Sequence, residues 1–206
     1  CYAMSVITAL TAQNTTGVYG IEQTSDEFIA NQLDCVFTDI FPDAVKIGMV
    51  YGNNSAKVIA DKLNFYKAKN IVTDVIDPVM VSTSGSRLIS EQGLENLKKY
   101  LLPISALATP NVPEAEILSG INIKNLQDMQ NAAKIISDKY GCAVLCKGGH
   151  LEDCSDDLLY SDGEFYTYPS VRIDNPNTHG TGCTLSSAIA SNLAKGFEIP
   201  QAVENA

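Results

Sequence analysis

The sequence predicts a single α/β domain in which helices cover both faces of a largely parallel sheet. Short β-rich runs alternate with longer segments of helical period along the chain, which is the pattern of such folds. No linker-like or low-complexity segment interrupts the 206 residues, a length that one hydrophobic core can serve. We therefore expect residues 1–206 to form one domain.

The expected strands are short apolar runs that end at turn residues. Pro78 ends the third run directly after Asp77, because proline cannot donate to a strand ladder. Asp162-Gly163 lies between two alternating runs and predicts a hairpin. In order, the strand candidates are 6–10, 44–48, 70–80, 104–111, 142–149 and the two arms of the hairpin over 157–170.

The expected helices show apolar residues at helical spacing. Ser25, followed by Phe28, Ile29 and Leu33, resembles the start of a capped amphipathic helix. Gly196 is a natural stop for the helix that follows residue 183. The helix candidates are 25–37, 54–68, 91–102, 113–118, 126–140, about 183–195, and the beginning of a helix in 200–206.

Composition and charge narrow the class of protein. Hydrophobic residues make up 45% of the chain, and the formal charge of −10 disfavours nucleic acid as a partner. No apolar run approaches the roughly 18–20 residues that span a bilayer, and the N-terminus lacks the basic region of a signal peptide. The six cysteines have no C-x-x-C spacing, so we expect reduced thiols in a cytoplasmic protein with no membrane association.

The tetrapeptide Gly180-Thr181-Gly182-Cys183, called the glycine turn below, is the first candidate site. It stands at an expected helix start, where backbone N–H groups and the helix dipole attract anions, and glycine lets a ligand approach closely. A cysteine in the first turn is favoured as a thiolate. The alternative is an ordinary glycine turn with a small buried cysteine. It is not a Walker A loop, because the Gly-Lys-Ser/Thr ending is absent.

Further candidates follow other expected strands, and ligands in such sheets bind at the carboxyl ends of the strands. Asn111 and Glu114 place an amide and a carboxylate three residues apart, where they suit Mg²⁺ bound through its waters or, alternatively, a helix capping box. Asp77 is suited to binding the same Mg²⁺ ion or, alternatively, to forming the turn at the end of its strand. Lys147 suits a phosphate or is a solvated loop lysine, and Gln13 offers a donor and an acceptor to a small heterocycle.

Six segments in collinear order resemble the hydroxymethylpyrimidine/phosphomethylpyrimidine kinases of thiamine biosynthesis, which belong to the ribokinase-like superfamily. The resemblance spans the whole chain and rests on ITALTAQNTTGV, KIGM, DPVMV, ATPNVPEAEIL, VLCKGGHL and NTHGTGCTLSSAIA. It implies a three-layer α/β/α sandwich with a mostly parallel sheet. It also implies a homodimer that uses Mg²⁺ and ATP twice, first on 4-amino-5-hydroxymethyl-2-methylpyrimidine and then on its monophosphate.

The resemblance also implies roles for individual residues. The glycine turn (Gly180, Thr181, Gly182, Cys183) would be the anion hole, with Cys183 in the position of the catalytic base. The remaining roles are substrate contact by Gln13 and Met49, Mg²⁺ and phosphate contact by Asn111 and Glu114, and contact with the ATP phosphates by Asp77 and Lys147. The family pattern departs from this sequence at the ends: a strand with a glycine-rich loop before residue 1 and a longer final helix are implied and are not in the sequence.

Three alternatives remain open at this point. A pyridoxal or pyridoxine kinase of the same superfamily acts on a similar hydroxymethyl heterocycle. A thiol enzyme would use Cys183 as a nucleophile and needs a base such as His179 within hydrogen-bond reach, whereas we expect His150 and His179 to be loop hydrogen-bonders. A non-catalytic nucleotide-binding remnant is suggested by the missing first unit.

Overall fold

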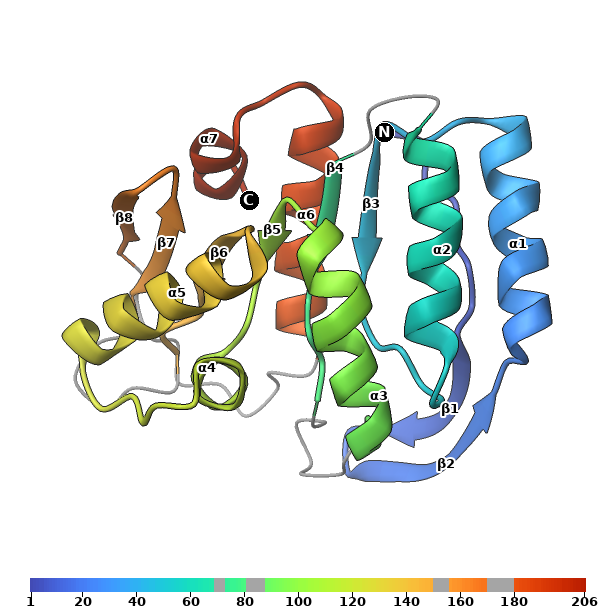
Figure 1. The fold of residues 1–206 in the computed structure, drawn as a ribbon, viewed down its shortest axis with the longest axis horizontal. Coiled ribbons are helices and arrows are strands. Elements are labelled where there is room, and N and C mark those ends of the chain that lie inside the picture. The colour runs from blue at the N-terminus through green and yellow to red at the C-terminus, as the bar shows by residue number, and fades with distance from the viewer. Residues whose placement is uncertain (69–72, 81–87, 150–155, 170–179) are drawn as a thin grey trace.

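A six-stranded sheet runs through the middle of the molecule with helices on both of its faces (Figure 1). The computed structural model describes residues 1–68, 73–80, 88–149, 156–169 and 180–206. The strands follow the order β3-β4-β5-β6-β7-β8; β3 to β6 are parallel, and β7 and β8 are antiparallel additions. Their bounds are β3 (Ala44–Ile47), β4 (Thr73–Ile76), β5 (Leu107–Ala108), β6 (Ala143–Cys146), β7 (Asp157–Ser161) and β8 (Glu164–Tyr168).

Seven α-helices of the described residues form the outer layers, which confirms the α/β/α prediction. The larger core lies on the face covered by α1 (Asp26–Asp39), α2 (Ser55–Lys67), α3 (Glu91–Asn96), α4 (Val112–Ser119) and α5 (Leu126–Tyr140). The smaller core lies under α6 (Thr181–Ala194) and α7 (Ile199–Glu204). Successive strand residues point to opposite faces. Ile76 therefore joins the larger core, and its neighbour Val75 joins the smaller one.

Local sequence signals explain most element boundaries. The Ser25 side chain accepts the Phe28 N–H at 3.2 Å and caps α1 as predicted. Asp162 and Gly163 both take positive φ angles, 53° and 86°, which is the backbone that a two-residue hairpin turn requires. The helix predicted over 91–102 continues from α3 through a π-helical turn, η1 (Leu97–Leu101), and a 3-10 turn, η2 (Leu102–Ile104).

The first strand prediction was wrong in place and partner. The strand β1 (Ala9–Asn14) begins three residues later than expected and pairs antiparallel with β2 (Gly17–Gln23), which we did not predict. Together they form a separate two-stranded sheet below the helices (Figure 1). Both strands are largely exposed, so they lack the buried face that gives a strand its apolar alternation. The turn signal was nevertheless present, because Asn14 Oδ1 accepts the N–H of Thr16 at 2.9 Å.

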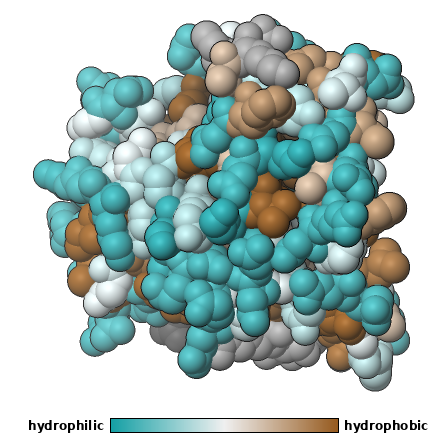
Figure 2. Space-filling view, turned by 45° about the vertical axis from the view of Figure 1, so that its right-hand side comes forward, coloured by the Kyte–Doolittle hydropathy of each residue, from teal (hydrophilic) through white to brown (hydrophobic). Residues whose placement is uncertain are grey.

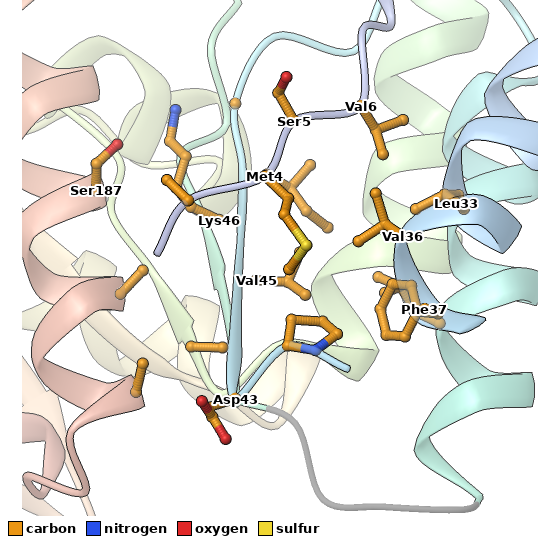
Figure 3. Close-up of a pocket in the computed structure, with 18 of the residues that line it drawn as sticks. Met4, Ser5, Val6, Leu33, Val36, Phe37, Asp43, Val45, Lys46 and Ser187 are labelled. Carbon is orange, nitrogen blue, oxygen red and sulfur yellow. The ribbon is translucent and has the colours of Figure 1, made fainter. Parts of the chain in front are cut away.

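The edge strand β3 borders a largely apolar pocket of about 530 Å³. Figure 3 shows Met4 and Val45 in its middle, with Val36 and Phe37 of α1 on one side and Ser187 of α6 on the other. The outer surface is different in character: the face shown in Figure 2 is mostly hydrophilic, with small apolar groups between polar side chains. Among the described residues, no helix combines the length and apolarity that crossing a membrane requires.

Candidate functional site

Three side chains of the sheet converge at the carboxyl ends of β4, β5 and β6. Val75, Leu107 and Leu145 pack toward α6 in the smaller core. Two positions after each of these residues stand Asp77, Thr109 and Lys147. They face the same side of the sheet, because side chains alternate along a strand. Backbone pairing continues past the strands, since Thr109 N donates to Ile76 O and Lys147 N donates to Pro110 O, each at 2.9 Å.

Asp77 and Lys147 form a nearly buried ion pair at this rim. The lysine Nζ donates to Asp77 Oδ1 at 2.9 Å, and the two side chains are 16% and 3% exposed for Lys147 and Asp77. The Thr109 hydroxyl donates to the same oxygen at 3.3 Å, and Ser186 of α6 reaches Oδ2 at 3.4 Å. Lys147 is therefore not a solvated loop lysine, and Asp77 does more than end a strand.

The glycine turn lies against this ion pair. Gly180 caps α6 in the left-handed region at φ 82°, which glycine adopts without strain. A Cβ added to Gly182 would lie 3.0 Å from Lys147 Nζ and 3.7 Å from Asp77 Oδ2, so a side chain there would displace the lysine. The structure thus brings together three of the predicted features: the helix N-terminus, the lysine and the aspartate.

Cys183 lies in the first turn of α6 and its side chain is exposed. Its carbonyl accepts the hydroxyl of Ser187 at 2.7 Å, a contact of the backbone and not of the thiol. An exposed thiol beside a helix N-terminus is open to a ligand held there. Both histidines named in the sequence analysis, His150 and His179, lie outside the described residues.

Asn111 and Glu114 form the capping box of α4. Asn111 Oδ1 accepts the Glu114 N–H and Glu114 Oε2 accepts the Asn111 N–H, each at 2.9 Å, while Oε1 accepts the Met80 N–H at 3.4 Å. Burial raises the pKa of the Glu114 carboxyl, and the charge of Asp77 adds to this, whereas the Asn111 N–H and the Lys147 ammonium oppose it. The carboxylate is therefore within electrostatic range of the ion pair.

The donor set around Glu114 bears on magnesium. No group of three His, Cys, Asp or Glu side chains in the described part of the chain is arranged to hold a metal ion. Each Glu114 oxygen accepts one N–H and keeps a second lone pair, which suits contact with a water of a hydrated ion. Mg²⁺ retains several waters in nucleotide sites, so these residues fit an ion held through water and not a direct cage.

The two residues expected at the pyrimidine lie on different elements, Met49 just after β3 and Gln13 on β1. Met49 follows β3 and lines the pocket at the sheet edge, and its carbonyl accepts the Thr8 hydroxyl at 2.7 Å. Gln13 lies half-buried on β1, next to an irregularity in the register between Ala12 and Gln13. Thr8 thus connects the start of the β1–β2 hairpin to Met49. A substrate role for Gln13 and Met49 stays a prediction.

Sequence reasoning missed three residues of the site. Thr109 stands two positions after a strand residue of the smaller core, and this alternation was a usable signal. Asp157 accepts the Gly148 N–H at 2.9 Å and so fixes the turn after Lys147; burial raises the pKa of its carboxyl. Ser186 gave no signal, because a serine in an apolar helical run reads as a small core residue.

Comparison with known proteins assigns the family. The family model for phosphomethylpyrimidine kinase matches residues 1–206. The chain belongs to the phosphomethylpyrimidine kinase family. Its fold is that of the ribokinase-like kinases, and the crystal structure of the phosphomethylpyrimidine kinase from Clostridium difficile superposes with a TM-score of 0.86 at 45% identity, covering 98% of this chain and 82% of that one.

Two other members of this wider group are informative. The thiamine biosynthesis bifunctional protein ThiED of Geobacter sulfurreducens is 45% identical over 206 residues, all of this chain and 41% of the relative. The chain therefore spans less than half the length of that bifunctional relative. The pyridoxal kinase from Staphylococcus aureus, solved in complex with AMP-PCP, superposes with a TM-score of 0.86 at 33% identity, covering 98% of this chain and 73% of that one. Pyridoxal kinases are thus structural neighbours of this phosphomethylpyrimidine kinase family member.

Proposed function

We propose that the chain phosphorylates 4-amino-5-hydroxymethyl-2-methylpyrimidine with ATP, and then phosphorylates the monophosphate to the diphosphate, as a step in thiamine biosynthesis. The observation that carries this proposal is the Asp77–Lys147 pair packed against the glycine turn. A buried ammonium beside a helix N-terminus is an arrangement for binding phosphoryl oxygens. Family membership supplies the pyrimidine and the second phosphorylation.

Charge stabilisation is the main task of the site in this reaction. The transition state of phosphoryl transfer is loose and carries its charge on the equatorial oxygens of the transferred group. The N–H groups at the start of α6 receive those oxygens, and Lys147 adds a full positive charge next to them. Mg²⁺, when bound with ATP, neutralises phosphate charge, and Asn111 and Glu114 would hold it through its waters.

Cys183 serves as the base in the first phosphorylation only. The hydroxymethyl oxygen forms a bond to the γ-phosphorus, the bond from that phosphorus to the β–γ bridging oxygen breaks, and ADP leaves. The hydroxyl proton passes to the Cys183 thiolate, which is exposed at the rim. In the second phosphorylation the nucleophile is already an anionic phosphate oxygen and has no proton to lose.

The remaining parts of the proposal concern the contacts with the pyrimidine, the role of Asp77, the oligomeric state and the location in the cell. Gln13 and Met49 contact the pyrimidine, and Asp77 keeps Lys147 on the ATP-phosphate side of the site. The working form is a homodimer in the cytoplasm. These assignments rest on family membership, together with the position of Met49 at the end of β3.

A coupled ADP-release assay tests the reaction. The protein is supplied with Mg-ATP and with either hydroxymethylpyrimidine or pyridoxal. We expect turnover with the pyrimidine to be greater. Greater turnover with pyridoxal would support the second candidate, a pyridoxal kinase, since the Staphylococcus aureus enzyme of that name superposes on this chain. Calorimetric binding of both ligands without turnover would indicate a non-catalytic nucleotide-binding protein.

The Cys183→Ala variant tests the role of the thiol. We expect kcat for the first phosphorylation to fall at least about 100-fold more than kcat for the second, which is the lower end of the range for a general base. Cys35→Ala is the matched control, because Cys35 is also an exposed cysteine but lies on α1. Equal losses in both steps with unchanged substrate binding contradict the role as a base. Complete loss of both steps in the variant, together with covalent trapping of substrate on Cys183 of the unsubstituted protein, would support the thiol-enzyme alternative.

A further inference from the structure

The hydroxyl of Ser186 reaches three acceptors inside the protein. Ser186 is fully buried in the second turn of α6, and its Oγ lies 2.9 Å from Gly182 O, 3.2 Å from Cys183 O and 3.4 Å from Asp77 Oδ2. Two of these acceptors belong to the glycine turn, and the third belongs to the carboxylate that binds Lys147. The side chain therefore stands between the two parts of the candidate site.

A serine hydroxyl has one proton, so it donates to one of these acceptors at a time. Serines within helices commonly donate to the carbonyl four residues earlier, which here is Gly182 O. The carboxylate is the more strongly attracting acceptor because it is charged. Since each peptide unit is planar, holding the Gly182 carbonyl also orients the N–H of Cys183 in the same unit. The hydroxyl therefore holds the turn when it donates to Gly182 O and holds Asp77 when it donates to the carboxylate.

Another serine of the same helix shows what an ordinary contact looks like. Ser191 Oγ donates to Ser187 O at 2.9 Å, the same bond to the fourth preceding carbonyl and at the same length. The Ser191 contact is exposed, however, and its acceptor, the Ser187 carbonyl, lies outside both the glycine turn and the ion pair. What sets Ser186 apart is burial together with the carboxylate of Asp77.

We propose that Ser186 is a positioning residue for phosphoryl transfer. It fixes Asp77 relative to the glycine turn, and through Asp77 it fixes the Lys147 ammonium beside Gly182. The inference rests on the proposed kinase function, because a positioning role requires a phosphoryl group whose charge develops at the glycine turn during the reaction. Electrostatic groups are effective in catalysis only when they are held in place before the reaction.

The test compares Ser186→Ala with Ser186→Cys and with the matched control Ser191→Ala. Cysteine keeps the approximate size of the side chain but is a weak donor, so it separates the hydrogen bond from packing. For both Ser186 variants we expect kcat to fall about tenfold, the loss of one hydrogen bond to a charged group, with KM for the pyrimidine within about twofold. Ser191→Ala should keep the kcat of the natural sequence.

A second readout does not depend on activity. Acetic anhydride labelling followed by mass spectrometry gives the acetylation rate of Lys147 relative to the other lysines of the same molecule. Release of Asp77 should raise the Lys147 rate in both Ser186 variants and leave it unchanged in Ser191→Ala. An unchanged kcat and an unchanged Lys147 rate in Ser186→Ala would overturn the proposal. An equal effect of Ser191→Ala on both readouts would also overturn it. If the unsubstituted protein releases no ADP, the kinase proposal fails, while the labelling experiment still decides whether Ser186 holds the ion pair.

Discussion

Two buried aspartates stand near opposite ends of β4, and each is paired with a lysine. Asp74 pairs with Lys67 at 2.5 Å, and Asp77, just past the strand, pairs with Lys147 at 2.9 Å. The aspartate side chains are 0% and 3% exposed, so the two pairs are equally removed from water at their acidic ends. Being three residues apart, they point to opposite faces of the sheet.

The two pairs differ in what surrounds them. Lys67 is the last residue of α2, and its Nζ also donates to the Ile104 carbonyl at 2.8 Å, so that pair ties a helix and η2 to the amino half of β4. The Asp77 pair instead receives the hydroxyls of Thr109 and Ser186 and lies beside a helix N-terminus. The same two residue types therefore connect a helix to the sheet at one end of the strand and, in the proposed function, bind ligand at the other, and the neighbours decide which.

The largest expected effect is on stability, from Lys67→Met. Removing one partner leaves Asp74 buried without its counter-charge, which typically costs about 3–5 kcal/mol and about 10 °C in Tm for a domain of this size. Thermal unfolding followed by circular dichroism measures it. The activity of the protein that remains folded should stay close to that of the unsubstituted chain. A large fall in kcat without a fall in Tm would reverse the roles assigned to the two pairs.

Lys147→Met should have the next largest effect, and on activity. Without the ammonium, the Asp77 charge lies next to the glycine turn and repels phosphate, so we expect kcat/KM for ATP to fall at least about 100-fold. In the double variant Lys147→Met/Asp77→Asn that repulsion is absent. Part of the lost activity, about tenfold, should therefore return in steady-state assays. A double variant no better than the single one would show that the lysine acts by direct contact alone.

The smallest effect is the pH dependence of stability from Asp74→Asn. Burial raises the pKa of the Asp74 carboxyl above the ordinary value of 3.8, although the Lys67 ammonium opposes the shift. A raised folded-state pKa contributes stability that is complete below pH 3.8 and is lost as pH rises through the folded value. The asparagine variant should therefore gain stability relative to the unsubstituted protein as the pH rises from 4 to 7. Urea unfolding at both pH values measures the difference, and a variant less stable at pH 7 than at pH 4 relative to the unsubstituted chain contradicts it.

Much of the fold was readable from local patterns, and the hairpin over 9–23 was the main failure. The helix predicted over 126–140 matches α5 residue for residue, because Asn125 caps its start and Gly141 ends it in the left-handed region. The strands β1 and β2 were misjudged because neither buries a continuous face, so their sequences show no hydrophobic periodicity. Tertiary contacts such as that of Thr8 with Met49 position this hairpin instead.

The candidate site, like the fold, was predictable from the sequence only in part. Asp77, Lys147 and the glycine turn were predicted from their places after strands, and the structure brings all three together. For Asn111 and Glu114 the capping box, left open as an alternative, is present, and the magnesium role stays a prediction. Ser186 could not be found this way, because its partner Asp77 is 109 residues away in the chain.

The sequence by itself determined the alternation of strands and helices, the caps, and which polar residues stand at strand ends. These depend on interactions within a few residues, which a linear pattern records. Only the tertiary structure decided which lysine met which aspartate, and that one serine lies between the ion pair and the glycine turn. Such contacts depend on the register of strands and the packing of α6 against the sheet, which bring distant parts of the chain together and leave no local trace.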